Sequence, residues 1–187
     1  YLLLWGHYRL LIELHLRLKD KVSDQELHMR NLNVLGLAYY YTGRVKESIS
    51  LNEQGLESAR KFNNRHYESM FINNLGRSYA SLADTHKAIE YFEKALAIVR
   101  EIGDRKGEGN HLDNLGSTYA VLGETRKAIE FHEQALVIAR EIGDRTGEST
   151  KLSNLGIAYA DLGNTSKAIE YYERAMTIDR ETGDRRG

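Results

Sequence analysis

The chain of 187 residues contains no cysteine and no proline. Without cysteine, disulfide bonds, thiol catalysis and cysteine-ligated metal sites are all excluded. Proline breaks the interior of a helix, so its absence favours a chain that is helical almost throughout. A cysteine-free chain is compatible with a reducing compartment, and we expect a cytoplasmic protein.

An excess of one charge sign is also missing. The 26 basic residues face 27 acidic ones, which leaves a formal net charge of −1. Proteins that bind nucleic acid carry a basic footprint, and anionic membrane surfaces attract clusters of positive charge. We therefore expect neither nucleic acid nor a membrane as a partner.

Long apolar runs are absent as well, even at the leucine-rich N-terminus. Charged residues interrupt residues 1–20, whereas a transmembrane helix needs about 20 mostly apolar residues. Four leucines share one helical face of this segment, which predicts a buried amphipathic helix: Leu4, Leu11, Leu14 and Leu18. The chain starts without Met and stops within a pattern at Gly187, so we expect a piece of a longer protein.

What the sequence does contain is an internal repeat with a step of 40 residues. Several residue types recur at this step without a gap: Leu35, Leu75, Leu115 and Leu155; Gly36, Gly76, Gly116 and Gly156; Tyr39, Tyr79, Tyr119 and Tyr159. The repeats are 32–71, 72–111, 112–151 and a truncated 152–187. Residues 1–31 form a partial repeat, mainly one helix and the start of the next. We expect all of them to form one domain.

Each repeat contains two helical patterns. In 112–151, a first helix is indicated by Leu112, Leu115 and Tyr119, and a second by Ala128, Ile129, Ala135, Leu136 and Ile138. Gly123 marks the turn between them. Gly143 suits the C-cap of the second helix and Asp144 the N-cap of the next. The Gly-Asp-Arg triplets at 103–105, 143–145 and 183–185 are therefore interpreted as turns; a phosphate-binding loop would need a preceding strand and a Lys-Ser or Lys-Thr pair.

A glycine inside the first helix needs a reason, because it costs about 1 kcal/mol relative to alanine. Gly116 follows Leu115 on the face that meets the second helix. We expect it to lie against the small residues Ala128 and Ala135 and so let the two helices approach closely.

The run L-x-x-L-G-x-x-Y, a small residue, then A-x-x-x-aromatic-x-x-A resembles a tetratricopeptide repeat. In 112–151 it comprises Leu112, Leu115, Gly116, Tyr119, Gly123, Ala128, His132 and Ala135. The step of 40 exceeds the usual 34 residues or so, and the terminal proline is missing. We expect the additional residues, between Ala135 and Leu152, to lengthen the second helix and the following turn. This long form is similar to kinesin light chains, Pins-type scaffolds and bacterial, especially cyanobacterial, signalling arrays.

The resemblance implies an all-α fold, a right-handed α-solenoid of antiparallel helix pairs whose first helices line the concave face. Such arrays present extended binding surfaces. It also implies a scaffold, not an enzyme, that needs no cofactor and binds a peptide or protein segment. The alternative is a regulatory or sensor array of a larger signalling ATPase, protease or kinase. An array that reads RNA would need basic grooves.

The candidate site lies on the first-helix stripe beside the core, where only asparagine recurs three times. A carboxamide offers a donor and an acceptor, which suits a peptide backbone. The asparagines could instead reflect recent duplication or cap a local turn. A clamp for acidic C-termini is disfavoured, because Asn73, Asp113 and Ser153 stand where it needs a cation. The candidate peptide-binding residues are Asn73, Asn74, Arg77, Asn110, Asp113, Asn114, Ser117, Thr150, Ser153 and Asn154.

Catalytic and metal-binding patterns have little support. The seven histidines are scattered, and His132 stands at an aromatic core position, which favours a packed side chain over a metal ligand. Both ends of the array show apolar side chains without a polar cap. We therefore expect end-to-end self-association through Leu2, Leu3, Leu4 and Trp5 at one end and Ile169, Tyr172 and Met176 at the other.

Overall fold

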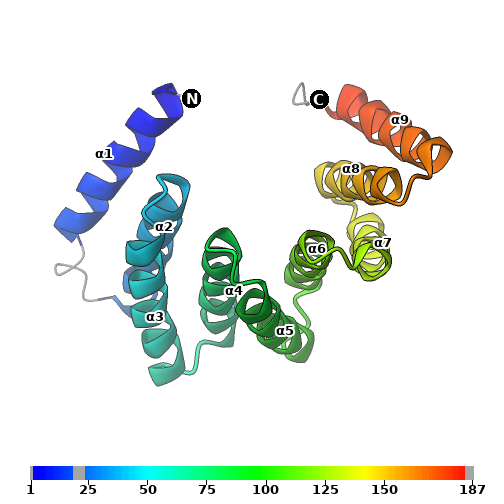
Figure 1. Cartoon of the computed structure of the whole chain (residues 1–187). Coiled ribbons are helices and arrows are strands. Elements are labelled where there is room, and N and C mark those ends of the chain that lie inside the picture. The colour runs from blue at the N-terminus through cyan, green and yellow to red at the C-terminus, as the bar shows by residue number, and fades with distance from the viewer. Residues whose placement is uncertain (1, 19–23, 184–187) are drawn as a thin grey trace. The chain divides into compact units, whose positions relative to one another are not determined.

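The computed structural model describes residues 2–18 and 24–183, without the side chains of residues 2–7, 15 and 18. Within these ranges the chain forms nine α-helices and no strand (Figure 1). The helices are α1 (Leu2–Leu18), α2 (Gln25–Tyr41), α3 (Val45–Lys61), α4 (Arg65–Ser81), α5 (Thr85–Glu101), α6 (Arg105–Val121), α7 (Thr125–Glu141), α8 (Arg145–Asp161) and α9 (Thr165–Thr182). The all-α fold of adjacent, packed helix pairs is the fold class that the repeat predicted.

The helices are regular in length. Each of α2 to α8 has 17 residues. The link at residues 142–144, between pairs, is as short as the link at 122–124, within a pair. The expectation of a longer turn between pairs is therefore wrong. The residues between Ala135 and Leu152 instead extend the two helices that flank the link.

Local capping explains these abrupt links. Gly143 has a φ of +69°, a left-handed conformation that glycine adopts without steric cost. The Asp144 side chain then accepts a hydrogen bond of 2.9 Å from the backbone N–H of Gly147, in the first turn of α8. Both predicted caps are confirmed, and the Gly-Asp-Arg triplet at 143–145 is a helix-to-helix turn.

The chain divides into two compact units, Tyr1–Ile98 and Val99–Gly187. In the first, α2 packs on α1 and α3, and α3 on α4, around a core that includes Leu32, Leu35, Leu51 and Phe71. In the second, α7 packs on α6 and α8, and α8 on α9, around Leu136, Leu152, Leu155 and Ile178. That all repeats form a single domain stays a prediction.

Helix α1 does not pack through the leucine face that its sequence predicted. Ile12 packs against the core of the first unit, and the Tyr8 ring stacks on Tyr41 with centroids 5.4 Å apart. Leu11 is half-buried, but Leu14 is 48% exposed, so a uniformly buried stripe is wrong. The reason is that α1 contacts one neighbour, α2, through the face that carries Tyr8 and Ile12. The Leu4 and Leu18 side chains lie outside the described residues, as do those of Leu2, Leu3 and Trp5.

Gly116 allows close approach, but not to the predicted partners. A Cβ atom at this position would lie 2.7 Å from the His132 ring, and the nearest atoms belong to that ring and not to Ala128 or Ala135. Gly76 and Gly156 meet the rings of Phe92 and Tyr172 in the same way, also at 2.7 Å. The glycine of the first helix thus makes room for a flat side chain on the second helix.

Candidate binding face and its polar seams

Asn74 in α4 is buried, with 8% of its surface exposed. Its Nδ2 donates to Oδ1 of Asn33 in α2 at 2.7 Å and to Oδ1 of Asn52 in α3 at 3.2 Å. A carboxamide nitrogen carries two hydrogens, so both are used within the chain. Asn74 thus joins two successive first helices and the second helix between them.

Asn154 in α8 makes the equivalent bond in the second unit. Its Nδ2 donates to Oδ1 of Asp113 in α6 at 3.0 Å. The bonds from Asn74 and Asn154 both reach back 41 residues, to the same position of the preceding first helix. The asparagine therefore fastens neighbouring repeats together, a role that the peptide-binding hypothesis did not include.

Around Asp113 the second unit holds a buried charged cluster. Nδ1 of His132 donates to Oδ1 of Asp113 at 2.8 Å, and Nζ of Lys151 lies 3.5 Å from Oδ2. His132 is only 2% exposed and Lys151 only 6%. Burial alone would raise the pKa of Asp113, but the hydrogen bond from His132 and the charge of Lys151 outweigh it and hold that pKa below its usual value. The carboxylate is thus ionised where it faces Lys151.

The hydrogen bond between successive first helices, and the residues around it, stand at equivalent positions in the two units. We call Asn33, Asn52, Phe71 and Asn74 the neutral seam, and Asp113, His132, Lys151 and Asn154 the charged seam. Each member of one seam is 80 residues from its counterpart in the other. His132 is packed, as its core position predicted. Its hydrogen bond to Asp113, an acid that was among the candidate ligand-binding residues, was not predicted.

The other predicted site residues vary in exposure. Asn110, Ser117 and Thr150 are exposed, whereas Asn73, Arg77, Asp113, Asn114, Ser153 and Asn154 are half-buried. Within the second unit, α6 and α8 contact each other, which brings Asp113 and Asn154 together. In the first unit, α4 contacts α2 and carries Asn73, Asn74 and Arg77.

Arg77 is held by aromatic side chains of α2. Its Nη2 donates to the Tyr41 hydroxyl at 3.0 Å, and its guanidinium lies 4.7 Å from the centroid of the Tyr40 ring and 5.4 Å from that of Tyr41. Half of Tyr41 remains exposed. Tyr41 lies on the predicted first-helix stripe, but neither tyrosine was among the candidate residues.

Two exposed apolar side chains also lie on the predicted first-helix stripe, although they were not among the candidate residues. Val121 at the end of α6 is 79% exposed, and Ile157 in α8 is 50% exposed. Together with Asn110, Ser117 and Thr150 they give α6 and α8 a mixed polar and apolar surface. We call these five residues the first-helix face of the second unit.

Within the part of the chain that the structure describes, no group of three or more histidine or acidic side chains is placed to hold a metal ion. No described helix is both long enough and apolar enough to cross a bilayer.

The family model of the tetratricopeptide repeat matches three overlapping stretches, residues 25–101, 67–141 and 107–181. The chain belongs to the tetratricopeptide repeat family. The 17-residue helices, three-residue links and glycine at the helix crossing are this chain's long version of that repeat. No curated protein matches the sequence significantly. The family is one of protein-interaction repeat scaffolds, and no enzymatic family is indicated.

Solved structures agree on the fold. A Rap protein complexed with competence and sporulation factor has a TM-score of 0.87 at 19% identity, over 96% of this chain and 51% of that one. A signal transduction ATPase with a tetratricopeptide repeat sensor, from Pyrococcus horikoshii, has a TM-score of 0.78 at 24% identity. The match covers 90% of this chain and 26% of the ATPase. The kinesin light chain-like repeats of Podosopora anserina have a TM-score of 0.69 at 20% identity, and the match covers 94% of this chain and 86% of that one. The chain thus spans about half of the Rap protein and a quarter of the ATPase.

Proposed function

We propose that the chain binds an extended peptide or protein segment along its first helices. The observation that carries the proposal is the first-helix face of the second unit. There α6 and α8 contact each other, Asn154 fastens them through Asp113, and hydroxyl, carboxamide and apolar side chains remain exposed on both helices. A fixed pair of helices with exposed groups of both kinds offers an extended ligand a preorganised surface.

The chemistry of this face suits a peptide backbone. Asn110 and Ser117 can each donate and accept hydrogen bonds, as a backbone does. The Thr150 hydroxyl donates to the backbone carbonyl of Thr146 at 3.0 Å and offers a ligand an acceptor. Val121 and Ile157 provide apolar contact for the ligand's side chains. The chain is nearly neutral overall, so we expect binding to depend only modestly on salt.

The recurring asparagines differ in the polar atoms that remain available to a ligand. Asn74 has both amide hydrogens engaged inside the first unit, so a ligand there would reach only its oxygen. Asn154 is half-buried and uses one amide hydrogen on Asp113. Its second hydrogen and its Oδ1 are the groups that we propose to meet the ligand.

The experiment is a selection of binders from a random peptide library, followed by matched variants. Ile157→Asp changes an apolar residue of α8 that is 50% exposed, and Val137→Asp changes one of α7 that is 53% exposed. We expect Ile157→Asp to weaken the selected peptide at least about tenfold, which is about 1.4 kcal/mol, and Val137→Asp to leave it unchanged. Equal losses in both variants, or loss only with Val137→Asp, would contradict the first-helix face as the site.

End-to-end association is a second proposed contact. Ile169, Tyr172 and Met176 of α9 are 53%, 37% and 49% exposed, whereas their counterparts in α7 are buried: Ile129, His132 and Leu136. A second copy is the occupant that we propose for this face. Light scattering should show weak association at high concentration that Met176→Asp abolishes. A strict monomer before mutation would refute it.

The alternative function is that of a sensor array, in which binding on the first helices controls a catalytic domain of a larger protein. It is favoured by the fold shared with the repeat sensor of the Pyrococcus horikoshii ATPase. A longer gene product whose nucleotide hydrolysis changes when the selected peptide is added would support it. If the peptide does not change the rate of hydrolysis, or if the gene encodes no such domain, the sensor function is ruled out and the scaffold function remains.

A further inference from the structure

The first unit departs from the repeat at three positions of its first helices. Tyr40 stands where the later repeats have alanine, at 80, 120 and 160. Tyr41 occupies a position that holds serine, valine and aspartate in the later repeats, and Arg77 occupies one that holds serine and isoleucine. We call Tyr40, Tyr41 and Arg77 the arginine cluster, because the two tyrosines of α2 and the arginine of α4 contact one another.

Aromatic side chains hold this cluster in place. The Tyr41 hydroxyl accepts a hydrogen bond of 3.0 Å from Nη2 of Arg77, and the guanidinium lies 4.7 Å from the centroid of the Tyr40 ring. The Tyr41 ring in turn stacks on Tyr8 of α1, with centroids 5.4 Å apart, and meets Tyr40 edge-on at an interplanar angle of 77°. A side chain that is fixed in advance loses little conformational entropy when a ligand binds to it.

Arg77 is half-buried and has no counterion among the described residues. In the same unit Arg44, Arg60 and Arg65 each pair with a glutamate. A guanidinium carries five N–H donors, and Arg77 uses one of them, on a neutral hydroxyl. Partial burial strengthens an ion pair, and the planar fork of a guanidinium matches a carboxylate through two parallel hydrogen bonds. The arginine cluster therefore favours a carboxylate.

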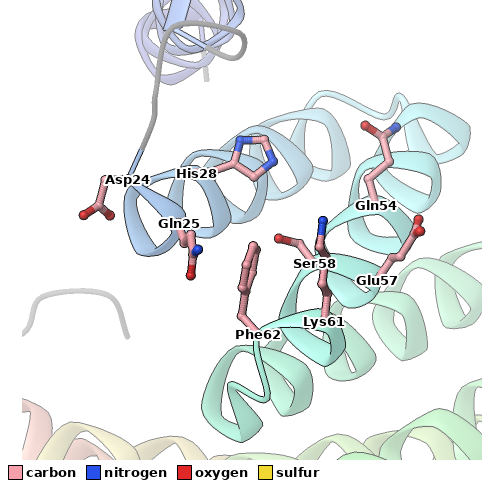
Figure 2. Close-up of a pocket in the computed structure, with 8 residues that line it drawn as sticks. All are labelled: Asp24, Gln25, His28, Gln54, Glu57, Ser58, Lys61 and Phe62. Carbon is pink, nitrogen blue, oxygen red and sulfur yellow. The ribbon is translucent and has the colours of Figure 1, made fainter.

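The pocket between the ends of α2 and α3 provides a contrast within the same unit (Figure 2). Nζ of Lys61 also lies near an aromatic ring there, 5.6 Å from the centroid of Phe62. Asp24 and Glu57 line the same pocket, so its charge is net negative and it favours no anion. Lys61 is therefore a matched control for Arg77, because it is a cation beside a ring whose surroundings already contain acids.

We propose that Arg77 pairs with the side-chain carboxylate of an aspartate or glutamate in the peptide ligand, and that Tyr40 and Tyr41 are its positioning residues. This inference rests on the proposed function, because it takes the ligand to be a peptide that lies along first helices. Asn73, one turn before Arg77, stands where a clamp for C-terminal carboxylates needs a second cation. We therefore assign the carboxylate to a side chain and not to a peptide terminus.

The test uses three short peptides that differ in one carboxylate. The first is acetyl-Ala-Ala-Glu-Ala-Ala-amide, the second has glutamine in place of glutamate, and the third is the glutamine peptide with a free C-terminal carboxylate. NMR signals of the Arg77 Nε–H and of the Tyr41 ring report binding. We expect the glutamate peptide to bind with a Kd of about 1–10 mM and the other two at least about fivefold more weakly. Equal binding of the glutamate and glutamine peptides, or tighter binding of the free terminus, would overturn the proposal.

Variants then assign the difference to Arg77. Arg77→Ser installs the residue found at 117 and should abolish the preference for glutamate over glutamine. Arg77→Gln, which keeps much of the stem, answers the same question if Arg77→Ser unfolds the chain. Lys61→Ser removes the same charge elsewhere in the unit and should leave the preference unchanged. A preference that persists in both Arg77 variants, or that falls equally in Lys61→Ser, would contradict the assignment.

The part of the tyrosines is measured by the same ratio of affinities. Tyr40→Ala installs the residue of the later repeats and should lower the preference for glutamate about twofold, because the guanidinium loses a ring that holds it. Affinity for the glutamine peptide should not change. An unchanged ratio would show that Tyr40 packs against Arg77 without positioning it.

This inference and the proposed function fail separately. A peptide library that yields no binder, or binders that are insensitive to Ile157→Asp, contradicts the first-helix face of the second unit and leaves the glutamate preference of Arg77 intact. Equal binding of the blocked glutamate and glutamine peptides contradicts the pairing with Arg77 and leaves the first-helix face intact.

Discussion

In the first unit Asn74 reaches the carboxamides of Asn33 and Asn52, whereas in the second unit Asn154 reaches the carboxylate of Asp113, which is also held by His132. The positions are the same and the bonds run between equivalent helices. The chemistry changes from neutral amides to a buried ion with its partners. What the repeat keeps is therefore a hydrogen bond from one first helix to the next, and the groups that satisfy it can be exchanged.

The position that Phe71 and Lys151 occupy in the two seams shows how such an exchange is accommodated. Phe71 fills the neutral seam, and a Cβ at Gly55 would lie 2.3 Å from its ring. In the charged seam the corresponding residues are Lys151 and Ala135. The larger ring thus goes with glycine, and the lysine stem goes with alanine. The stability of the charged seam also depends on each of its members, because a buried ion that loses its counterion raises the free energy of the folded state.

The largest expected difference concerns the acceptor of each seam. Asp113→Ala leaves Lys151 and His132 buried without their acceptor, so we expect the free energy of unfolding to fall by about 3–5 kcal/mol. Asn33→Ala removes a neutral acceptor and should cost about 1–2 kcal/mol. Urea unfolding followed by circular dichroism measures both. Equal losses would show that the charges of the second seam are not desolvated, and Asp113→Asn should fall between the two.

Acid should weaken the second unit through His111, which occupies the position of Phe71 and Lys151. Its ring is buried and neither ring nitrogen has a hydrogen-bond partner in the described structure. Burial lowers the pKa of His111 to about 4 from 6.5, against a small opposing effect of the Asp104 charge. The unfolded histidine binds a proton more readily, so the stability is complete above pH 6.5 and is lost as the pH falls towards 4.

The measurement is the free energy of unfolding at pH 7.5 and at pH 5. We expect a loss of about 2 kcal/mol that is traceable to His111. His111→Phe, which copies the residue at position 71, should remove this part of the pH dependence. Asp113 does not contribute in this window, because its lowered pKa means that its stabilisation is lost only below its usual value of 3.8. An undiminished loss of stability between pH 7.5 and pH 5 in His111→Phe would contradict the assignment.

Packing around Phe71 in the neutral seam predicts the next largest effect. Gly55→Ala places a Cβ 2.3 Å from the Phe71 ring and should destabilise the first unit by about 1–3 kcal/mol. Phe71→Leu in the same chain should recover part of that loss. The reverse change in the second unit, Ala135→Gly, meets no ring and should cost about 1 kcal/mol through helix propensity. A thermal melt in which Gly55→Ala gains stability would show that Phe71 can move aside.

Helix caps and turns could be predicted from the sequence, but the hydrogen bonds between successive repeats could not. The turn at 143–145 could be predicted because Gly143 and Asp144 cap helices through neighbouring backbone groups. The seams could not, because the bond from Asn154 to Asp113 spans 41 residues and its direction depends on how α6 and α8 pack. A recurring asparagine therefore looked like a ligand contact. The exchange of Asn33, Asn52 and Phe71 for Asp113, His132 and Lys151 at one common offset was the available signal.

The helix-crossing glycines give the smallest and most discriminating difference. At Gly36 an added Cβ would meet Nδ2 of Asn52 at 3.0 Å, the far end of a side chain. At Gly116 it would meet the His132 ring at 2.7 Å, and this ring is held by Asp113. Alanine gains about 1 kcal/mol in helix propensity at both positions, while overpacking costs about 1–3 kcal/mol where the neighbour cannot move.

Gly116→Ala should therefore lower the free energy of unfolding by about 1 kcal/mol more than Gly36→Ala. Changing the neighbour tests the cause. In a chain that carries His132→Asn, the residue found at position 52, the added cost of Gly116→Ala should disappear, because the fixed ring has gone. If the cost persists in the double variant, the backbone of α7 and not the His132 ring limits the approach of the two helices.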